Sequence, residues 1–194
     1  QLGRSEPLRD TARVLSRYVD CLIVRTFGQE KLDELAEYGS LPVVNALTDQ
    51  GHPCQLMADL LTIYERTPDF SKVTVTWVGD GNNMANSLIV GFLKMGAHVS
   101  IACPKAYQPD AQVLSFTEQY PGKFFMTESP EEAAKDADVI FTDVWASMGQ
   151  EEEKAVREKA FRGYQINAEL LAKAHLGCMV QHCLPAHRGE EITA

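Results

Sequence analysis

A chain of 194 residues is long enough to bury a hydrophobic core, and its composition, 45% hydrophobic and 23% charged, is typical of a globular protein. Acidic side chains outnumber basic ones by 27 to 18, and the net charge of −9 argues against nucleic acid or an anionic membrane surface as a partner. No apolar run approaches the roughly 20 residues that a membrane-spanning helix needs.

Strands and helices alternate along the chain, which predicts parallel βα units. In the first third we expect helices over residues 5–18 and 29–38 and strands over residues 21–24 and 41–46. A third helix begins at His52-Pro53 and runs to about Arg66. Its apolar spacing predicts four inward-facing residues: Leu56, Leu60, Leu61 and Tyr64. A Thr-Pro-Asp sequence at residues 67–69 ends this helix, so we expect a domain boundary at residues 67/68.

The remaining residues predict a more complete α/β unit. We expect its strands over residues 73–78, 98–102, 124–127, 139–142 and 178–181. The helices between and beside them are expected over residues 84–95, 110–119, 130–135, 150–161 and 168–174. The predicted fold class is therefore α/β, with two doubly wound parallel-sheet domains over residues 1–67 and 68–194, the second of them Rossmann-like. The chain starts without Met and ends just after a motif, so we expect it to be part of a longer protein whose first domain is only partly present.

Two short motifs give the clearest functional signal. Residues 143–149 read Asp-Val-Trp-Ala-Ser-Met-Gly, residues 182–185 read His-Cys-Leu-Pro, and each motif directly follows a predicted strand. Ligands of open parallel sheets bind outside the carboxyl ends of the strands, so both motifs are expected in one crevice. Together they supply a carboxylate, a hydroxyl, a thiol and an imidazole, which indicates a site.

A glycine-rich turn lies between the first strand of the second unit and the helix after it. Residues 79–84 read Gly-Asp-Gly-Asn-Asn-Met, which departs from the dinucleotide fingerprint because Met84 replaces its third glycine. The next strand also lacks the acidic residue that would bind a ribose, so a nicotinamide or flavin oxidoreductase is disfavoured. A tight turn explains the glycines, whereas Asn82 and Asn83 are suited to bind an amino-acid carboxylate or amine.

Two further positions place polar side chains at the predicted mouth of a sheet. His52 and Gln55 begin a helix whose N–H groups and dipole can face a ligand, and Arg25 ends a buried strand. Structural alternatives remain open: a capping histidine, an ion-paired Arg25, a helix cap at Asp143 and an inert thiol at Cys183. The functional reading is favoured because these residues follow different predicted strands.

The five cysteines are widely spaced and lack a Cys-x-x-Cys pair. This pattern argues against a zinc site or a disulfide framework, and reduced thiols fit a cytoplasmic protein. We therefore expect no metal.

Over essentially the whole chain, these motifs resemble the ornithine carbamoyltransferases, within the larger aspartate/ornithine carbamoyltransferase superfamily. The resemblance rests on the motifs at residues 143–149 and 182–185, Gly-Asp-Gly-Asn-Asn at 79–83, and His-Pro-x-Gln at 52–55 preceded by Arg25. The first two motifs separate ornithine enzymes from aspartate enzymes. The helix at residues 10–17 supports the superfamily only.

The resemblance implies that the carbamoyl group of carbamoyl phosphate is transferred to the δ-amine of L-ornithine, giving L-citrulline and phosphate. Carbamoyl phosphate would be bound by Arg25, His52, Gln55, Cys183 and Leu184. L-ornithine would be bound by Asn83, Asp143, Ser147 and Met148. Catalysis would depend on Arg25, His52 and Cys183, with no cofactor.

The family also implies a larger organisation. Residues 1–67 would be the C-terminal half of a carbamoyl-phosphate-binding domain plus a linking helix, and residues 68–194 a C-terminally truncated ornithine-binding domain. A cytoplasmic homotrimer, or a multiple of trimers, would act in arginine metabolism, in either synthesis or breakdown.

The chain also departs from the family pattern. It lacks the Ser-x-Arg-Thr phosphate loop, a C-terminal arginine and the final helix, and it carries Cys54 where threonine is common. The 194 residues alone are therefore expected to be inactive or very weak.

The alternatives to an ornithine carbamoyltransferase are a carbamoyltransferase for putrescine or acetylornithine, and a non-catalytic subunit of the same fold. Asp143 argues against both amines because it needs a free α-ammonium group as its partner.

Overall fold

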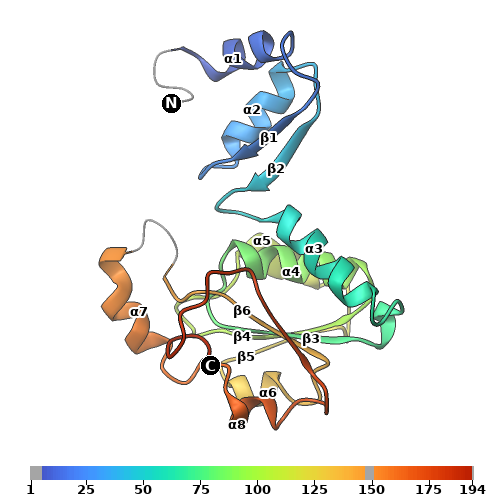
Figure 1. Cartoon of the computed structure of the whole chain (residues 1–194), viewed down its shortest axis with the longest axis vertical. Helices are drawn as coiled ribbons and strands as arrows, with labels where there is room; N and C mark the ends of the chain where they lie inside the picture. Colours follow the sequence, from blue (N-terminus) through green and yellow to red (C-terminus); the bar gives the residue numbers. More distant parts are fainter. Residues whose placement is uncertain (1–5, 147–150, 194) are drawn as a thin grey trace.

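The computed structural model describes residues 6–146 and 151–193. Within these ranges the chain forms two α/β units, each built on a parallel sheet, with one helix between them (Figure 1). The predicted α/β class with parallel sheets is confirmed. Among the described residues, no helix is both long and apolar enough to cross a membrane.

The N-terminal unit is a small sheet with helices on one face. Its elements are α1 (Leu8–Leu15), β1 (Leu22–Arg25), α2 (Glu30–Tyr38) and β2 (Val43–Leu47), and the two strands pair in parallel. Leu8, Ala12 and Leu35 are buried between helices and strands. Ile23, on the opposite face of β1, is 74% exposed. The described residues therefore cover one face of this sheet.

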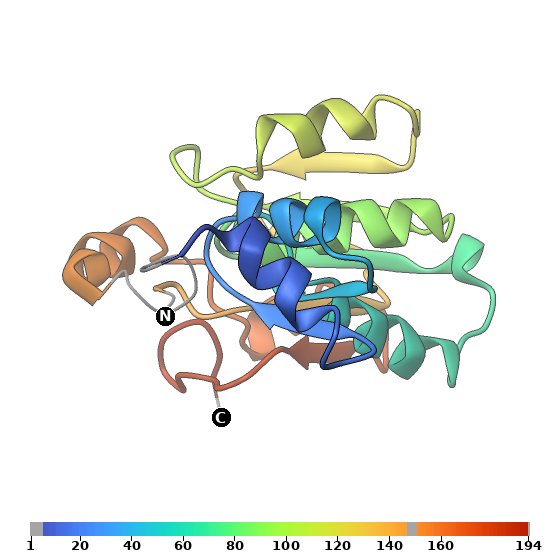
Figure 2. The same cartoon turned by 90° about the horizontal axis from the view of Figure 1, so that it is seen from above.

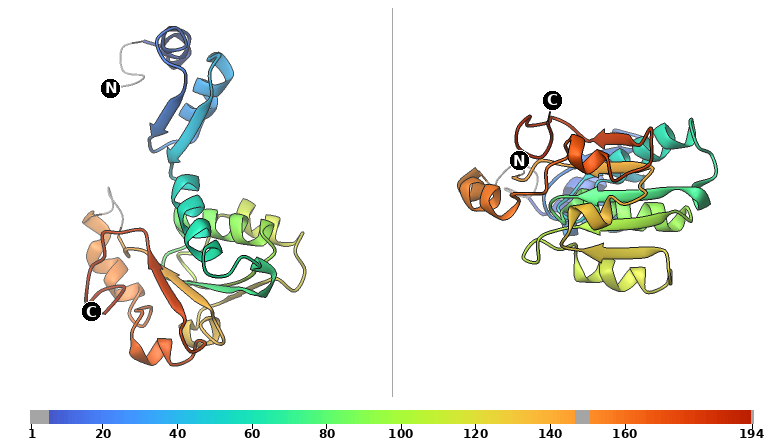
Figure 3. Two further views of the ribbon diagram at one scale, coloured as in Figure 1. Left: turned by 45° about the vertical axis from the view of Figure 1, so that its right-hand side comes forward. Right: turned by 90° about the horizontal axis from the view of Figure 1, so that it is seen from below.

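Helix α3 (Pro53–Tyr64) connects the two units (Figure 3). It begins at Pro53, whose fixed φ angle suits the first helical position, and the His52 side chain accepts a hydrogen bond from the backbone N–H of Gln55. The substrate-site residues predicted on this segment are thus anchored by the start of the helix.

The buried face of α3 differs from the predicted one. Leu60 and Ile63 are buried, whereas Leu61 and Tyr64 are 58% and 52% exposed, so the inward position predicted for Leu61 and Tyr64 is wrong. Leu56 packs against the core as predicted. The helix is apolar on several sides, and its periodicity alone does not identify the packed face.

The C-terminal unit is a doubly wound parallel sheet. In the described ranges its strands are β3 (Thr74–Val78), β4 (His98–Ala102), β5 (Phe124–Thr127), β6 (Val139–Thr142) and β7 (Met179–His182), in the order β5-β4-β3-β6-β7. The chain runs outward from β3 to β5 and then returns to the other side of β3 for β6 and β7. The carboxyl ends of β3 and β6 therefore form a switch point, where sheets of this kind bind ligands.

Helices cover both faces of the five-stranded sheet (Figure 1), and Figure 2 looks onto the side of the sheet that carries α4 and α5. α4 (Asn83–Lys94) and α5 (Ala111–Thr117) lie with α3 on one face, and α6 (Pro130–Ala133) and α8 (Ala168–Leu171) lie on the other. α7 (Lys154–Ala160) lies beyond the carboxyl ends of the strands (Figure 1).

An aromatic core supports the central strands. Phe92 on α4 is fully buried, and its ring centroid lies 6.0 Å from that of Phe70 and 5.7 Å from that of Phe141 on β6. Trp77 on β3 is 1% exposed. Burying one such side chain is worth roughly 1.5–3 kcal/mol, so these residues hold β3 and β6 firmly beneath the switch point.

The strands have nearly the predicted bounds, but several helices are shorter. β4, β5 and β6 begin and end as predicted. α1 begins at Leu8 because Pro7 has an extended ψ angle of 138°. The helix predicted over residues 150–161 is divided into a 3-10 turn, η2 (Glu151–Glu153), and α7, while Gln150 lies outside the described residues. The boundary expected at residues 67/68 falls between α3 and the 3-10 turn η1 (Phe70–Lys72), and it stays a prediction.

Candidate active site

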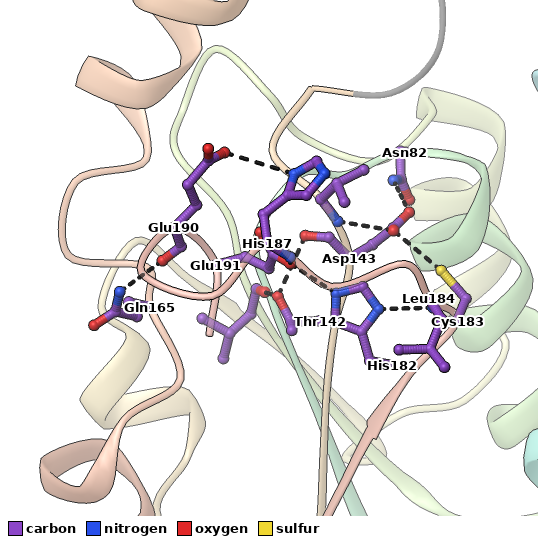
Figure 4. Close-up of polar contacts among 12 residues, drawn as sticks. Asn82, Thr142, Asp143, Gln165, His182, Cys183, Leu184, His187, Glu190 and Glu191 are labelled. Atoms are coloured by element: carbon purple, nitrogen blue, oxygen red, sulfur yellow. Dashed lines mark hydrogen bonds and ion pairs between the residues drawn. The ribbon is translucent and has the colours of Figure 1, made fainter. Parts of the chain in front are cut away.

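The carboxyl ends of β3, β6 and β7 bring together side chains that the sequence singles out. Asn82 follows β3, Asp143 follows β6 and Cys183 follows β7. Figure 4 shows Asp143 between Asn82 and Cys183. This cluster therefore occupies the switch point of the sheet.

Among the described residues, three donors hold the carboxylate of Asp143. Its Oδ1 accepts from the backbone N–H of Val144 at 2.8 Å and from the Cys183 thiol at 3.0 Å, and its Oδ2 accepts from Nδ2 of Asn82 at 2.9 Å. A carboxylate offers about four acceptor directions, so Oδ2 retains room for a further donor. Asp143 is 8% exposed, and it caps neither η2 nor α7 in the described ranges. The alternative of a helix cap therefore has no support.

Asn82, rather than Asn83, contacts Asp143. Oδ1 of Asn82 accepts from two backbone N–H groups in the first turn of α4, which leaves Nδ2 for the carboxylate. Nδ2 of Asn83 instead donates to the backbone carbonyl of Thr48 at 2.7 Å and so joins α4 to the N-terminal unit. The strong preference of asparagine for the N-cap position is the sequence signal for Asn82. A contact of Asn83 with ornithine stays a prediction.

The thiol of Cys183 stays protonated at neutral pH. Burial is the largest cause that raises its pKa, and the carboxylate of Asp143 raises it further. Because the thiolate is the nucleophilic form of cysteine, this residue is unsuited to covalent attack. Its direct bond to Asp143 nevertheless makes it part of the cluster.

His52 lies within electrostatic reach of both Arg25 and Asp143. Burial is the largest cause that lowers the pKa of His52, the positive charge of Arg25 lowers it further, and Asp143 acts in the opposite direction. The imidazole is therefore neutral at pH 7. Its Nδ1 accepts from the backbone N–H of Gln55 at 3.4 Å, which assigns the proton to Nε2.

Gln55 is oriented by a carboxylate one turn further along α3. Its Nε2 donates to Oδ1 of Asp59 at 2.9 Å, which leaves Oε1 to accept from a ligand. Asp59 is 8% exposed; burial raises its pKa to about 6, and the hydrogen bond from Gln55 acts in the opposite direction. Sequence reasoning missed Asp59, although its i,i+4 spacing from Gln55 is a usable signal.

Arg25 ends β1, and its residue is exposed. The ion pairs found in the described ranges do not include Arg25, so the alternative of a structural ion pair has no support there. Its charge acts on His52 across the junction of the two units.

The segment after Asp143 is anchored by a buried ion pair. Arg157 on α7 contacts Oδ2 of Asp80 at 2.8 Å and the carbonyl oxygen of Trp145 at 3.1 Å, and the two charged side chains are 8% and 10% exposed. Sequence reasoning missed Arg157 because the pair joins residues far apart in the chain. The predicted ornithine contacts Ser147 and Met148 lie outside the described residues.

The His-Cys-Leu-Pro segment is fixed by the histidine itself. Nδ1 of His182 accepts from the backbone N–H of Leu184 at 2.8 Å, and Nε2 contacts the carboxylate of Glu191 at 3.0 Å. Ligand atoms of Asp143, His182 and Cys183 lie within 4.8 Å of one another, a grouping that can hold a metal ion. All three side chains already have hydrogen-bond partners, which a metal ion would have to replace.

Comparison with known proteins identifies the family. Residues 71–194 match the family described as "Aspartate/ornithine carbamoyltransferase, Asp/Orn binding domain". The chain belongs to the aspartate/ornithine carbamoyltransferase family. Residues 1–65 match the second domain of this carbamoyltransferase family, described as "carbamoyl-P binding domain".

Curated members of the family are similar over the whole chain. The chain is 62% identical over 193 residues to the ornithine carbamoyltransferase of Oleidesulfovibrio alaskensis and 54% identical over 194 residues to that of Geobacter sulfurreducens. Both alignments cover 100% of this chain and 64% of the relative. The chain therefore spans about 64% of the length of these carbamoyltransferases.

Solved carbamoyltransferase structures share the fold. The ornithine carbamoyltransferase from Pyrococcus furiosus matches with a TM-score of 0.94 and 48% identity, covering 100% of this chain and 63% of its own. The enzyme from Thermus thermophilus matches with a TM-score of 0.88 and 41% identity, over 100% and 63% of the two chains. The arrangement of the elements around the candidate site is thus that of the family.

Proposed function

We propose that this protein acts as an ornithine carbamoyltransferase, which transfers the carbamoyl group of carbamoyl phosphate to the δ-amine of L-ornithine. The products are L-citrulline and phosphate. Relatives of this name at 62% and 54% identity support the proposal. The observation that carries it is the buried carboxylate of Asp143 at the switch point, hydrogen-bonded to Asn82 and Cys183, with the cation Arg25 at the end of β1. These charges match the phosphate of one substrate and the α-ammonium of the other.

Arg25, His52 and Gln55 form the carbamoyl phosphate side of the proposed site. The guanidinium group of Arg25 suits paired phosphate oxygens. The Nε2–H of His52 can donate to the carbamoyl oxygen, where negative charge develops during attack, and one such donor can be worth about 3 kcal/mol. Oε1 of Gln55 can accept from the carbamoyl NH₂ group, because Asp59 already takes its Nε2. We propose that the backbone of Cys183 and Leu184 contacts the same group.

Asp143 is the central residue of the proposed ornithine side. Its remaining acceptor direction suits the α-ammonium group, and the three bonds that hold the carboxylate fix the direction of the substrate. Asn83, Ser147 and Met148 are the further proposed contacts. Holding the amino-acid end in this way aligns the δ-amine with the carbamoyl carbon, and such alignment can supply several kcal/mol.

The proposed reaction is direct attack by the amine. The δ-nitrogen forms a bond to the carbamoyl carbon while the bond from this carbon to the phosphate oxygen breaks, and the departing phosphate can take up the proton that the nitrogen loses. The raised pKa of Cys183 favours this route over a covalent thiol intermediate. A protonated thiol can instead accept a hydrogen bond from the δ-amine and so orient the nitrogen lone pair.

Several features of the whole protein belong to the same proposal. Residues 1–67 would serve carbamoyl phosphate and residues 68–194 ornithine, in keeping with the two domains that match. We further propose a homotrimer, or a multiple of trimers, that works in the cytoplasm in arginine metabolism. The oligomer is testable by light scattering.

Citrulline formation tests the proposal. The assay supplies carbamoyl phosphate with ornithine, putrescine or acetylornithine in parallel, and it uses this chain and a protein extended to the length of its relatives. Activity with ornithine alone is expected from the extended protein. Activity with another amine would reject the ornithine assignment, and activity with none would favour a non-catalytic subunit.

A further inference from the structure

A buried carboxylate lies behind the His182–Leu184 segment (Figure 4). Glu191 is 0% exposed, and the side chain of His182 is 6% exposed. Oε1 of Glu191 accepts from Nε2 of His182 at 3.0 Å and from the backbone N–H of His187 at 2.6 Å. A carboxylate so far from water is costly unless donors satisfy it, and both of these donors meet Oε1, whereas Oε2 is buried without a hydrogen-bond partner among the described residues.

Glu191 keeps its charge and its position. Burial acts to raise the pKa of Glu191, but interactions led by the hydrogen bond from His182, with those from the backbone of His187 and of Glu191 itself, act against it, and the pKa lies below its usual value. The backbone is held as well, because the N–H of Ile166 donates to the carbonyl oxygen of Glu191 at 2.9 Å. The carboxylate is therefore a fixed acceptor.

This acceptor decides which ring nitrogen of His182 carries the proton. Nε2 has to donate to the carboxylate, so the neutral ring presents a lone pair at Nδ1. Nδ1 accepts from the backbone N–H of Leu184 at 2.8 Å. Leu184 has a φ angle of 62°, a left-handed conformation that costs a residue with a side chain energy and needs support from its surroundings. The bond to His182 supplies such support.

Cys183 lies between the two residues joined by this bond. Its thiol donates to Oδ1 of Asp143 at 3.0 Å, and the alignment of that bond depends on the backbone on both sides of Cys183. A continuous series of contacts thus runs from Glu191 through His182 and Leu184 to the carboxylate of Asp143.

We infer that Glu191 and His182 are positioning residues: Glu191 holds His182 in the Nε2–H tautomer, and Nδ1 then aligns the Cys183–Leu184 backbone with Asp143. The substrates that this alignment serves are those of the proposed function, on which this part of the inference rests. Both ring nitrogens are engaged within the protein, so His182 acts through Leu184 and not by touching substrate.

Two substitutions of His182 separate its contacts. In His182→Asn, the side-chain oxygen lies near the former Nδ1 and can still accept from Leu184, while Glu191 loses its partner. In His182→Gln, the amide reaches Glu191, while the N–H of Leu184 loses its acceptor. In the protein extended to the length of its relatives, we expect His182→Gln to lower kcat with ornithine on the order of tenfold more than His182→Asn, because misplaced groups are costly in catalysis. Equal losses in the two variants would overturn the inference.

Two substitutions of Glu191 provide a second, independent test. Glu191→Gln keeps an acceptor oxygen for His182, whereas Glu191→Ala removes it. We expect the Gln variant to retain most of the wild-type kcat and the Ala variant to lose it on the order of tenfold. Melting temperatures are compared first. If the Ala variant fails to fold, the comparison of His182→Asn with His182→Gln decides. A Gln variant as inactive as a folded Ala variant would contradict the inference.

A spectroscopic test separates this inference from the proposed function. Imidazole ¹⁵N NMR of the wild-type protein is expected to show His182 with a protonated Nε2 and an unprotonated Nδ1, whatever amine is carbamoylated. If the wild-type protein, extended to the length of its relatives, were inactive with every amine, the proposed function would be rejected, while this tautomer would still support the roles of Glu191 and His182. If an active enzyme carried the proton on Nδ1 of His182 instead, the roles given to Glu191 and His182 would be rejected, but the proposed function would not.

Discussion

Three donors of the described part of the chain bond to the carboxylate of Asp143, and a carboxylate offers about four acceptor directions. Asp143→Asn keeps the shape of the side chain but removes the charge that the α-ammonium group of ornithine would meet. We expect the KM for ornithine to rise about 100-fold, equivalent to about 3 kcal/mol. Carbamoyl phosphate binding should change little, because that substrate is assigned to Arg25, His52 and Gln55.

Calorimetric titration with each substrate measures the two effects separately. Asp20→Asn on the surface is the matched control and should leave both affinities unchanged. A parallel loss of both affinities in Asp143→Asn would contradict the assignment of Asp143 to the amino acid.

Asp59 makes the protein sensitive to pH. Its pKa in the folded state is raised by burial to about 6, above the value of 3.8 expected in the unfolded chain. The folded state therefore binds the proton more tightly, and ionising Asp59 costs stability as the pH rises from about 4 to 6. Above this window the cost is complete, at about 3 kcal/mol by order of magnitude.

Asp59→Asn should remove this cost while keeping an oxygen that accepts from Gln55. We expect the free energy of unfolding of the variant, measured in urea, to match the wild type near pH 4 and exceed it by 1 to about 3 kcal/mol at pH 7.5. Asp49→Asn, at an exposed position, should change it by less than about 0.5 kcal/mol at both pH values. If the difference in free energy of unfolding between Asp59→Asn and the wild type did not vary with pH, the ionisation of Asp59 would be excluded as its cause.

Some residues of the candidate site could be predicted from the sequence, and others could not. Asp143 and Cys183 could be predicted because polar residues directly after apolar strands meet at one edge of a parallel sheet. Asp59 and Glu191 could not, because a carboxylate becomes informative only when it is buried, and burial depends on the packing of distant segments. The choice between Asn82 and Asn83 likewise needed the cap of α4.

At the scale of elements, α7 is attached to the sheet by one buried charge pair. Arg157→Met would leave Asp80 buried without its cation, and we expect a loss of 3–5 kcal/mol in the free energy of unfolding. Asp80→Asn together with Arg157→Met should lose clearly less, because no unpaired charge remains. Urea unfolding of the wild type, both single variants and the double variant measures the coupling.

A more exposed pair that joins α7 to the C-terminal segment provides the control. Lys154 contacts Glu190 at 2.8 Å, with side chains 49% and 28% exposed, so Lys154→Met should cost less than about 1 kcal/mol. If Arg157→Met cost no more than this control, the pair with Asp80 would not be what holds α7.

Elements differ in how well the sequence predicts them. β4, β5 and β6 were predicted to the residue because buried parallel strands are short apolar runs bounded by polar turns. The face of α3 was partly wrong, since Leu61 and Tyr64 are exposed on a helix that is apolar on several sides. Tertiary packing, and not periodicity, selects the buried side of such a helix.

At the scale of the whole molecule, α4 holds the loop that leads into α3. Asn83 donates to the carbonyl of Thr48, Asn86 donates to the carbonyl of Gln50, and Ser87 accepts from the backbone N–H of His52. These contacts join residues 35 or 36 positions apart in the chain. No local pattern predicts them, yet they set the position of His52 relative to Asp143.

Ser87 is the sharpest test of this connection. Its hydroxyl accepts from the N–H of His52 at 2.7 Å and donates to the carbonyl of Asn83 at 2.9 Å, so Ser87→Ala leaves the N–H of His52 without its acceptor. The stability loss should be about 1 kcal/mol, as for an ordinary hydrogen bond. The loss in kcat should be larger, on the order of tenfold, because a small shift of His52 moves its Nε2–H away from the carbamoyl oxygen.

Steady-state kinetics and urea unfolding of the same preparations of the extended protein compare the two effects. Ser115→Ala on α5 makes the same change at an exposed helical position and should alter neither quantity. Because Ser87 touches neither proposed substrate, a large kinetic effect beside a small loss of stability is expected only if the contact between the units positions His52. A kcat within about twofold of the wild type would mean that the loop holds His52 without help from α4.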